Sequence, residues 1–370
     1  MLVLGKKYLL QVRGKGLTRQ MGLAGTKKKQ PLYRVHSSKQ SCGGQTRTGD
    51  LRVMSPTSYH CSTPHCKTNA YFCAVQFQAA FISVLGKPNA GKSTLINALL
   101  GDSLMITNRK AQTTRYRTKG ILSTAHYQLI FSDTPGFLEP NNLLQKGMLN
   151  EINASFVDAD LFYLLADLSD PEPLDFLEKQ QIDVPWKKSI LVLNKMDLID
   201  QELLEEKIEY LLTQVKPRSF VPISASHKFN LETLLKQSLE LAPVHPPYYP
   251  EEEVSDRNVR FFIEEIIRNH ILTLYQEEIP YGVHVQIERY LTGKKLDKIY
   301  VHILSERDSQ KKILIGKGGE KIKKLGTKSR VEIEQFIEKR VFLDLSVKIL
   351  PKWREKESFL KKQGFRFEKK

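Results

Sequence analysis

The feature that most constrains the fold of this 370-residue chain is the run "GKPNAGKST" at residues 86–94. It follows the apolar run "AFISVL" and opens an apolar-periodic stretch at residues 92–100, which is the strand-loop-helix context of a phosphate-binding loop. In such loops backbone N–H groups surround phosphate oxygens, the lysine neutralises the β and γ oxygens, and the serine hydroxyl reaches Mg²⁺. The run therefore predicts an α/β domain that binds a nucleotide together with Mg²⁺.

The rest of this predicted domain shows the rhythm of a doubly wound fold with a mostly parallel sheet. Short apolar runs of buried-strand type are "AFISVL", "YQLIFS", "LFYLLA", "SILVLN" and "SFVPIS". Helical patterns separate them at residues 92–100, 142–156, 201–214 and 230–241. Because strands alternate with helices, we expect one α/β domain over residues 79–242.

Three further motifs each end one of these apolar runs, where ligands bind in open α/β sheets. "DTPG" places a carboxylate, Asp133, within reach of the Mg²⁺ shell, and the N–H of Gly136 can face a γ-phosphate. "NKMD" supplies Asp197, which can accept from both N1–H and the exocyclic amine of guanine, a donor pair that adenine lacks. "SAS" at residues 224–226 would close over the guanine carbonyl. The nucleotide is therefore predicted to be GTP.

These motifs give a definite set of predicted site residues. The predicted GTP-binding residues are Gly86, Asn89, Ala90, Gly91, Lys92, Ser93, Thr94, Asp133, Thr134, Pro135, Gly136, Asn194, Lys195, Asp197, Ser224 and Ala225. The predicted metal ligands are Ser93, Thr114 and Asp133, and the predicted catalytic residues are Lys92, Thr114 and Gly136.

The segment "ITNRKAQTTRYR", residues 106–117, lies between the first two motifs and is called the switch segment below. A threonine that coordinates Mg²⁺ only while the γ-phosphate is present is expected here. Thr113 and Thr114 are both candidates, and we prefer Thr114. The basic residues Arg109, Lys110, Arg115 and Arg117 are interpreted as solvated loop charges rather than as transition-state groups.

A proline-rich connector marks the end of the first domain. "APVHPPYYPEEE", residues 242–253, has four prolines within eight residues, which end any helix and favour an extended chain. We place the linker at residues 243–255 and a second domain at 256–368. The order of elements expected in the second domain is helix, strand, strand, helix, helix, strand, which is an α+β order, and its last helix is expected at about residues 327–339.

Inside that second domain, "ILIGKGGEKIKKLG" contains a Gly-x-x-Gly loop. Such a loop, in this order of elements and among lysines, is typical of a type II (prokaryotic-type) KH domain, whose loop clamps the backbone of single-stranded RNA. The apolar residues Ile313, Ile315, Ile322 and Leu325 are expected to form the groove floor, with some of them in the core. The predicted RNA-binding residues are Ile315, Gly316, Lys317, Gly318, Gly319, Lys321 and Lys324.

Together "GKPNAGKSTLINALLG", "RKAQTTR", "DTPGF", "NKMDL" and "VPISA" resemble the Era family of P-loop GTPases, in the TrmE-Era-EngA-like class, over about residues 79–368. The resemblance implies GTP hydrolysis and binding of the 3′ end of 16S ribosomal RNA during maturation of the small ribosomal subunit. It also implies a cytoplasmic protein with peripheral contact to the inner membrane. We expect a monomer.

The residue after the "DTPG" glycine departs from many GTPases, in which a glutamine orients the attacking water. Here it is Phe137, which cannot hydrogen-bond a water. The resemblance implies that backbone groups position the water and that potassium, ligated by Asn89, supplies positive charge. Asn89 has a second interpretation as an amide that stabilises the loop.

Two other functions stay open. The chain could be an RNA-binding assembly module in which GTP is mainly structural, or another GTPase of the same class acting on tRNA modification. The KH-type frame discriminates against the second, because those relatives lack it or carry a second GTPase domain.

The first 78 residues differ from the rest in charge and cysteine content. They hold 13 Lys/Arg and one acid, giving +12 of the formal net charge of +16, and all four cysteines. Residues 79–250 carry −3 and residues 251–370 carry +7. The first segment is expected to be disordered. Three explanations for its presence stay open: translated DNA upstream of the true start, an organellar transit peptide, or a Cys/His metal site at "HCSTPHC". The cysteine-free remainder fits a reducing compartment.

Overall fold

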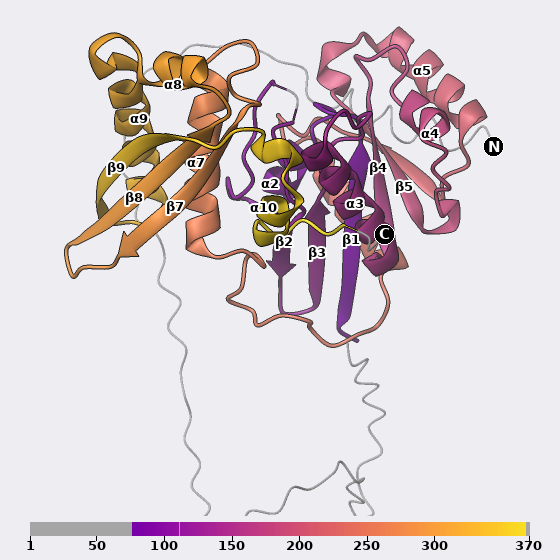
Figure 1. Cartoon of the computed structure of the whole chain (residues 1–370). Coiled ribbons are helices and arrows are strands. Elements are labelled where there is room, and N and C mark those ends of the chain that lie inside the picture. Colours follow the sequence, from indigo (N-terminus) through magenta and orange to yellow (C-terminus); the bar gives the residue numbers. More distant parts are fainter. Residues whose placement is uncertain (1–75, 111, 368–370) are drawn as a thin grey trace, which may run out of the picture. The chain divides into compact units, whose positions relative to one another are not determined.

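The computed structural model describes residues 76–110 and 112–367 (Figure 1). The expectations for the first segment, including its cysteines, therefore fall almost entirely outside the described residues. Among the residues described, no helix is both long and apolar enough to cross a membrane.

A six-stranded sheet forms the centre of the nucleotide-binding domain. Its strands are β1 (Gln78–Gly86), β2 (Thr118–Ser123), β3 (Tyr127–Asp133), β4 (Leu161–Asp167), β5 (Ser189–Asn194) and β6 (Ser219–Pro222). Their order is β2-β3-β1-β4-β5-β6, and every neighbouring pair is parallel except the edge pair β2–β3. This confirms the predicted doubly wound, mostly parallel sheet. The antiparallel strand β2 was not predicted, because its short sequence "TKGILS" has a weak apolar pattern.

Helices cover both faces of this sheet, since successive side chains of a buried strand point to opposite faces. In β4, the side chains of Leu161, Tyr163 and Leu165 join the core under α2 (Lys92–Leu100) and α6 (Leu231–Leu241). The intervening residues of β4 join the core under α3 (Leu143–Asp158), α4 (Asp175–Lys179) and α5 (Gln201–Gln214). The predicted helices at 92–100 and 201–214 are observed with the predicted bounds.

The connector after this domain is fixed to the sheet. The side-chain amide of Gln128 in β3 donates to the Tyr249 carbonyl at 2.8 Å, and its oxygen accepts from the N–H groups of Tyr248 and Tyr249 at 2.8 and 3.0 Å. The ring of Tyr248 packs 4.6 Å from that of Phe81 in β1. The proline-rich stretch is therefore docked along the end of the sheet.

The C-terminal part contains the expected order of elements. These are α7 (Val259–Leu274), β7 (Val283–Leu291), β8 (Leu296–Ser305), α8 (Asp308–Ile315), α9 (Glu320–Phe336) and β9 (Arg340–Ile349). The sheet order is β7-β8-β9, with β7–β8 antiparallel and β8–β9 parallel. The elements of this part are coloured orange to yellow in Figure 1. Apolar residues of the three helices and of one sheet face form a single core.

The long helix of this part differs from its predicted bounds of about 327–339. It begins at Glu320, directly after the Gly-x-x-Gly loop, and runs through Gly326 to Phe336. A glycine inside a helix costs only about 1 kcal/mol relative to alanine. Burial of Leu325, Ser329 and Ile333 on one face of the helix outweighs that cost.

After β9 the chain returns to the nucleotide-binding domain. The short turn Trp353–Glu355, α10 (Glu357–Lys362) and the ring of Phe365 pack against α3, where Leu144 and Met148 complete an apolar cluster. This terminal segment was not predicted, because its sequence is too short and too charged to show a periodic pattern.

Candidate functional sites

The phosphate-binding loop is held by the lysine of its own motif. Lys92 is only 6% exposed, and its Nζ donates to the carbonyls of Gly86 and Lys87 at 3.1 and 2.9 Å. Burial lowers the pKa of Lys92 to about 8, and the nearby Asp133 carboxylate acts in the opposite direction. A cavity of about 670 Å³ opens beside the loop, which is a suitable size for a nucleotide.

Three oxygen groups converge at the start of α2. The Ser93 hydroxyl donates to Asp133 Oδ2 at 2.7 Å, and the Thr114 hydroxyl lies 3.1 Å from both of these oxygens. Asp133 is buried, and among the described residues its Oδ1 atom finds no hydrogen-bond partner. An orphaned carboxylate oxygen beside two hydroxyls fits a hard cation such as Mg²⁺.

The electrostatics of Asp133 agree with a cation site. Burial raises its pKa to about 6, against the hydrogen bond from Ser93 and the charge of Lys92. The neighbouring threonine is turned elsewhere, because Thr113 donates to the Lys110 carbonyl at 2.6 Å. The structure thus brings Thr114, and not Thr113, to the predicted metal ligands.

On the base side of the cavity, Asn194 acts as a brace. Its amide donates to the Ala90 carbonyl at 2.8 Å, and its oxygen accepts from the Ala225 N–H at 3.0 Å. Lys195 pairs with Asp167 at 2.5 Å. Asp197 remains 24% exposed and lies 3.6 Å from the His227 ring, so its carboxylate is accessible from the cavity that it lines.

The predicted GTP-binding residues divide into two groups. Those that line the cavity are Asn89, Gly91, Lys92, Ser93, Thr94, Gly136, Asn194, Lys195, Asp197 and Ala225, together with the predicted metal ligand Thr114. Those that do not line it are Gly86, Ala90, Asp133, Thr134, Pro135 and Ser224. Thr134 illustrates the second group, since its hydroxyl is buried and donates to the Val84 carbonyl at 2.6 Å.

Several cavity residues are not among the predicted site residues. They are Pro88, Ile106, Thr107, Asn108, Arg109, Gln112, Thr113, Leu198 and Ser226, of which Thr113 was the second candidate for the metal-binding threonine and Ser226 belongs to the predicted "SAS" loop. Most belong to the switch segment, which has no repeating pattern of its own. Their position between two recognisable motifs was the only available signal.

The residues after Asp133 are fixed by close packing. A side chain on Gly136 would place its Cβ 2.6 Å from the backbone nitrogen of Pro88, so the phosphate-binding loop leaves room only for glycine there. Phe137 is 5% exposed and stacks on Phe176 with ring centroids 4.8 Å apart. Its ring belongs to the core and does not line the cavity.

The interpretation of the switch-segment cations as solvated was wrong for two of them. Arg115 is 1% exposed, and Arg117 is 8% exposed and pairs with Asp158 at 2.7 Å. Lys110 donates to the Tyr275 carbonyl at 2.5 Å. Sequence alone gave Arg115 and Lys110 no visible partner, because the carbonyls that accept from them lie about 165 residues further along the chain.

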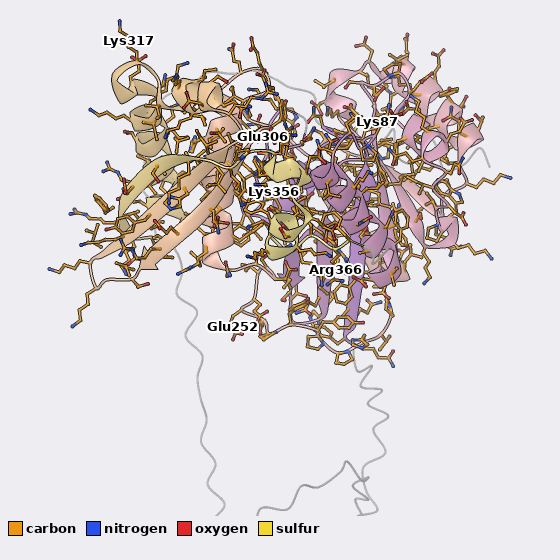
Figure 2. The ribbon with its side chains drawn as sticks, viewed as in Figure 1. Lys87, Glu252, Glu306, Lys317, Lys356 and Arg366 are labelled. Atoms are coloured by element: carbon orange, nitrogen blue, oxygen red, sulfur yellow. The ribbon has the colours of Figure 1, made fainter. Side chains whose placement is uncertain are left out.

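The Gly-x-x-Gly loop lies between α8 and α9. Gly316, Gly318 and Gly319 have φ values of 75°, 61° and 80°, which L side chains rarely adopt. Lys317 projects from this loop away from the ribbon (Figure 2), and it is exposed, as are Lys321 and Lys324 on α9. The loop therefore offers backbone N–H groups and lysines to a phosphate chain.

The apolar residues expected beside this loop divide between the core and the surface, as predicted. Leu325 is fully buried in the core, whereas Ile313 is 43% exposed. Ile315 and Ile322 are partly buried against the same core and remain partly accessible. Of the four predicted floor residues, Ile313, Ile315 and Ile322 present apolar surface and Leu325 does not.

Family models identify the class of each part. Residues 81–195 match the model described as a 50S ribosome-binding GTPase, and residues 278–354 match the KH domain. The chain is thus a GTPase-type domain joined to a KH domain.

Curated relatives identify the family. The chain is 37% identical to GTPase Era of Thermoanaerobacter sp. (strain X514) over 299 residues, which cover 79% of this chain and 98% of the relative. It is 38% identical to chloroplastic GTPase ERA1 of Zea mays over 296 residues, covering 78% and 70%. The chain belongs to the GTPase Era family.

Solved structures agree. The chain is similar, with a TM-score of 0.72 and 31% identity, to the crystal structure of Era in complex with MgGDPNP and nucleotides 1506–1542 of 16S ribosomal RNA, covering 77% of this chain and 98% of that one. The same values describe its similarity to a variant of Aquifex aeolicus Era bound to GDP.AlF4⁻.

Proposed function

We propose that this chain binds and hydrolyses GTP and uses its KH loop to bind the 3′ end of 16S ribosomal RNA during maturation of the small (30S) subunit. The observation that carries the proposal is a single chain in which a phosphate cavity and an exposed, lysine-flanked Gly-x-x-Gly loop are both built. The similarity to an Era structure with MgGDPNP and 16S ribosomal RNA supports it.

The residues take distinct roles in this proposal. Lys92 would exchange its loop carbonyls for the β and γ oxygens of GTP, and the Gly136 N–H would face the γ-phosphate. Ser93, Thr114 and Asp133 would hold Mg²⁺, which when bound neutralises charge on the phosphate oxygens. Since Phe137 is committed to the core, we propose that backbone groups orient the attacking water.

Base selection falls to Asp197. Its carboxylate would accept from N1–H and the exocyclic amine of guanine, while Asn194 holds the phosphate loop and the "SAS" loop at a fixed distance. A site built to pair with both donors rejects a base that lacks them by several orders of magnitude.

The RNA part of the proposal is tested by reversing one charge in the loop. Lys317→Asp places a carboxylate where a phosphate would lie, so we expect the Kd for the 3′-terminal 16S sequence to rise at least about tenfold, equivalent to about 1.4 kcal/mol. Lys236→Asp, an exposed change on α6, is the matched control. Equal binding by both variants, or equal binding of a scrambled RNA by the unaltered protein, would overturn the proposal.

A second candidate is an RNA-binding assembly module in which GTP is mainly structural. The buried position of Phe137 favours it, because no glutamine stands ready to orient water. Lys92→Ala that abolishes turnover but still supports 30S maturation would establish this candidate.

The compartment is part of the same proposal. We propose a cytoplasmic protein with peripheral contact to the inner membrane. Recovery of all the protein in the low-salt soluble fraction of lysed cells would remove the membrane contact.

A further inference from the structure

The switch segment is held on both sides of Thr114 by residues of the KH part. Before Thr114, the Arg268 guanidinium on α7 donates to the carbonyls of Gln112, at 3.4 Å, and Thr113. After Thr114, the Arg115 guanidinium donates to the Val283 carbonyl at 2.8 Å. Thr114, which contacts Ser93 and Asp133, is therefore held in place through the residues on either side of it, Thr113 and Arg115.

Arg268 is built for this contact. It is 2% exposed, and its Nε donates to Glu265 Oε1 at 2.7 Å in a two-point pair with that carboxylate. Glu265 neutralises the buried charge and fixes the plane of the guanidinium, so the remaining N–H groups point at the switch segment. A planar group with five donors can serve a carboxylate and two carbonyls together, whereas a lysine ammonium has three donors on a flexible stem.

Arg115 makes the opposite kind of connection, from the switch segment into the KH part. Its guanidinium also donates to the carbonyls of Pro280 and Tyr281, at 3.3 and 3.2 Å, and lies 5.8 Å from the centre of the Trp353 ring. These acceptors belong to the loop before β7. Side chains from both parts thus meet backbone carbonyls of the other.

We propose that Arg268 is a positioning residue that holds Thr114 at the Mg²⁺ site, so that the KH part sets the GTP-bound geometry of the switch segment. The inference rests on the proposed function and specifies its regulation. Thr114 reaches Mg²⁺ only in the triphosphate state, because the γ-phosphate orders such a segment. Arg268 therefore stabilises the GTP form and leaves the GDP form unaffected.

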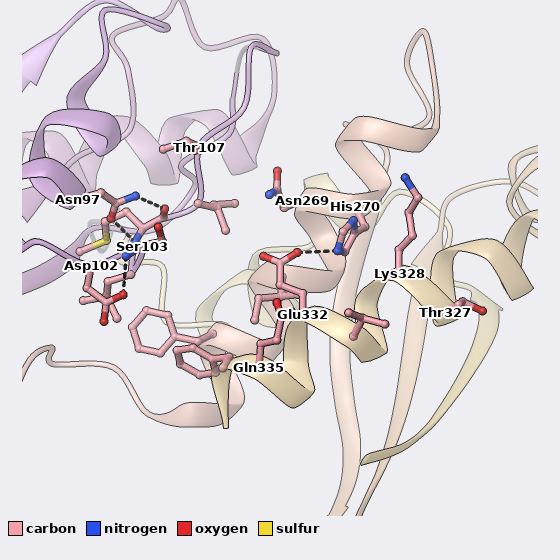
Figure 3. A pocket seen from close by; sticks show the side chains of 17 residues that line it. Asn97, Asp102, Ser103, Thr107, Asn269, His270, Thr327, Lys328, Glu332 and Gln335 are labelled. Atoms are coloured by element: carbon pink, nitrogen blue, oxygen red, sulfur yellow. Dashed lines mark hydrogen bonds and ion pairs between the residues drawn. The ribbon is translucent and has the colours of Figure 1, made fainter. Parts of the chain in front are cut away.

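A continuous set of packed elements joins this contact to the RNA loop. Helix α9 begins at Glu320, directly after Gly319, and packs beside α7. His270 of α7 meets Glu332 of α9 at 2.7 Å, as the dashed line in Figure 3 shows. The ring of Phe262 on α7 lies 5.6 Å from Phe336 on α9. Movement of the RNA loop would therefore reach α7, and through Arg268 the switch segment.

The connector offers a weaker route. Gln128 fixes Tyr248 and Tyr249 to the sheet of the nucleotide-binding domain. The connector is therefore held by that domain, and this hydrogen bonding gives it no second position through which to signal. We therefore assign the communication to the contact around Thr114.

The test compares two arginine-to-lysine changes on α7. Arg268→Lys keeps a positive charge beside Glu265. A lysine ammonium, however, cannot pair with Glu265 and also donate to the carbonyls of both Gln112 and Thr113. Arg260→Lys is the control, because Arg260 is exposed and lies 5.8 Å from the Tyr290 ring within the KH part. We expect Arg268→Lys to weaken binding of a non-hydrolysable GTP analogue about tenfold, to lower kcat for GTP, and to change GDP affinity less than about twofold. The control should match the unaltered protein in all three.

A second variant keeps the inference testable if Arg268→Lys folds poorly. The double variant Glu265→Gln/Arg268→Gln removes both buried charges together, and the same selective loss is expected. Equal losses for GDP and the analogue, or no loss for either, would overturn the inference, since general destabilisation does not distinguish the two nucleotides.

These outcomes are separable from failure of the proposed function. If the unaltered protein binds 16S RNA and hydrolyses GTP while Arg268→Lys shows no selective effect, only the positioning role is lost. If the unaltered protein ignores the RNA, the proposed function fails whatever Arg268→Lys does to nucleotides.

Discussion

Two of the contacts that join the C-terminal part to the nucleotide-binding domain differ in chemistry. Around Thr114 the contact is polar, with guanidinium groups donating to backbone carbonyls. On α3 the contact is apolar, with Leu360, Phe365 and Trp353 packed against Leu144. Polar contacts of this kind depend on direction and are lost when a loop changes conformation, whereas apolar burial is non-directional. We therefore expect the contact on α3 to persist in both nucleotide states and the contact at Thr114 to change with the nucleotide.

The largest expected effect comes from breaking the apolar anchor. Leu360 is fully buried, so Leu360→Ala should lower the free energy of unfolding by about 2–5 kcal/mol through lost burial and the cavity left behind. The ratio of GTP-analogue to GDP affinity should stay unchanged. Urea unfolding and nucleotide titration measure the two quantities.

The matched control for that anchor is Leu296→Ala, at a residue that is 40% exposed on β8. It should cost less than about 1 kcal/mol, since little apolar area leaves water there. Suppose that Leu360→Ala is fully folded under the assay conditions and its ratio of GTP-analogue to GDP affinity still differs from that of the unaltered protein. This result would contradict the assignment of the α3 contact to stability and the Thr114 contact to nucleotide response.

The next effect concerns the polar side. Asn89 has φ 64° and lines the same cavity as Thr114. If it ligates potassium, GTP turnover should be about tenfold faster in potassium chloride than in sodium chloride, equivalent to about 1.4 kcal/mol of barrier. Asn89→Ala should remove that difference. Equal rates of the unaltered protein in the two salts would remove the potassium prediction and leave Asn89 as a loop-stabilising amide.

The smallest expected effect concerns Glu264, a residue of α7 that influences the stability of the fold and not the contact with the switch segment. Burial raises the pKa of Glu264 to about 7, against a hydrogen bond from the Ile287 N–H at 2.7 Å. The folded state therefore binds a proton more tightly than the unfolded state, and this contribution to stability is lost as pH rises from about 4.5 through 7.

Glu264→Gln keeps an oxygen for that N–H and removes the charge. Its Tm should exceed that of the unaltered protein by roughly 2–4 °C at pH 8, and the gap should close toward pH 5. A gap that is constant with pH, measured by thermal unfolding at four pH values, would show that Glu264 does not titrate as described.

Much of the fold followed from the sequence because buried strands and their motifs are local signals. The runs "YQLIFS" and "SILVLN" were predicted as strands and are β3 and β5. What failed were features whose cause is distant in the chain. The edge strand β2 and the terminal helix α10 depend on pairing or packing partners that no short window contains.

The site shows the same limit. Gly91 and Asp197 line the cavity where the motifs predicted them, because a phosphate loop specifies its own conformation. Arg115 could not be interpreted correctly, because its acceptors are carbonyls near residue 283 that carry no side-chain signature. Arg268 was not predicted for the same reason, because its acceptors in the switch segment are the backbone carbonyls of Gln112 and Thr113.

The central claim is that the contact around Thr114 couples nucleotide state to RNA binding. Its most direct measurement is the Kd of the 3′-terminal 16S RNA for the unaltered protein and for Arg268→Lys, each with GDP and with a non-hydrolysable GTP analogue at saturation. The account predicts that the two nucleotides give Kd values about tenfold apart in the unaltered protein and less than about threefold apart in Arg268→Lys. Identical RNA affinity of the unaltered protein with both nucleotides would contradict it.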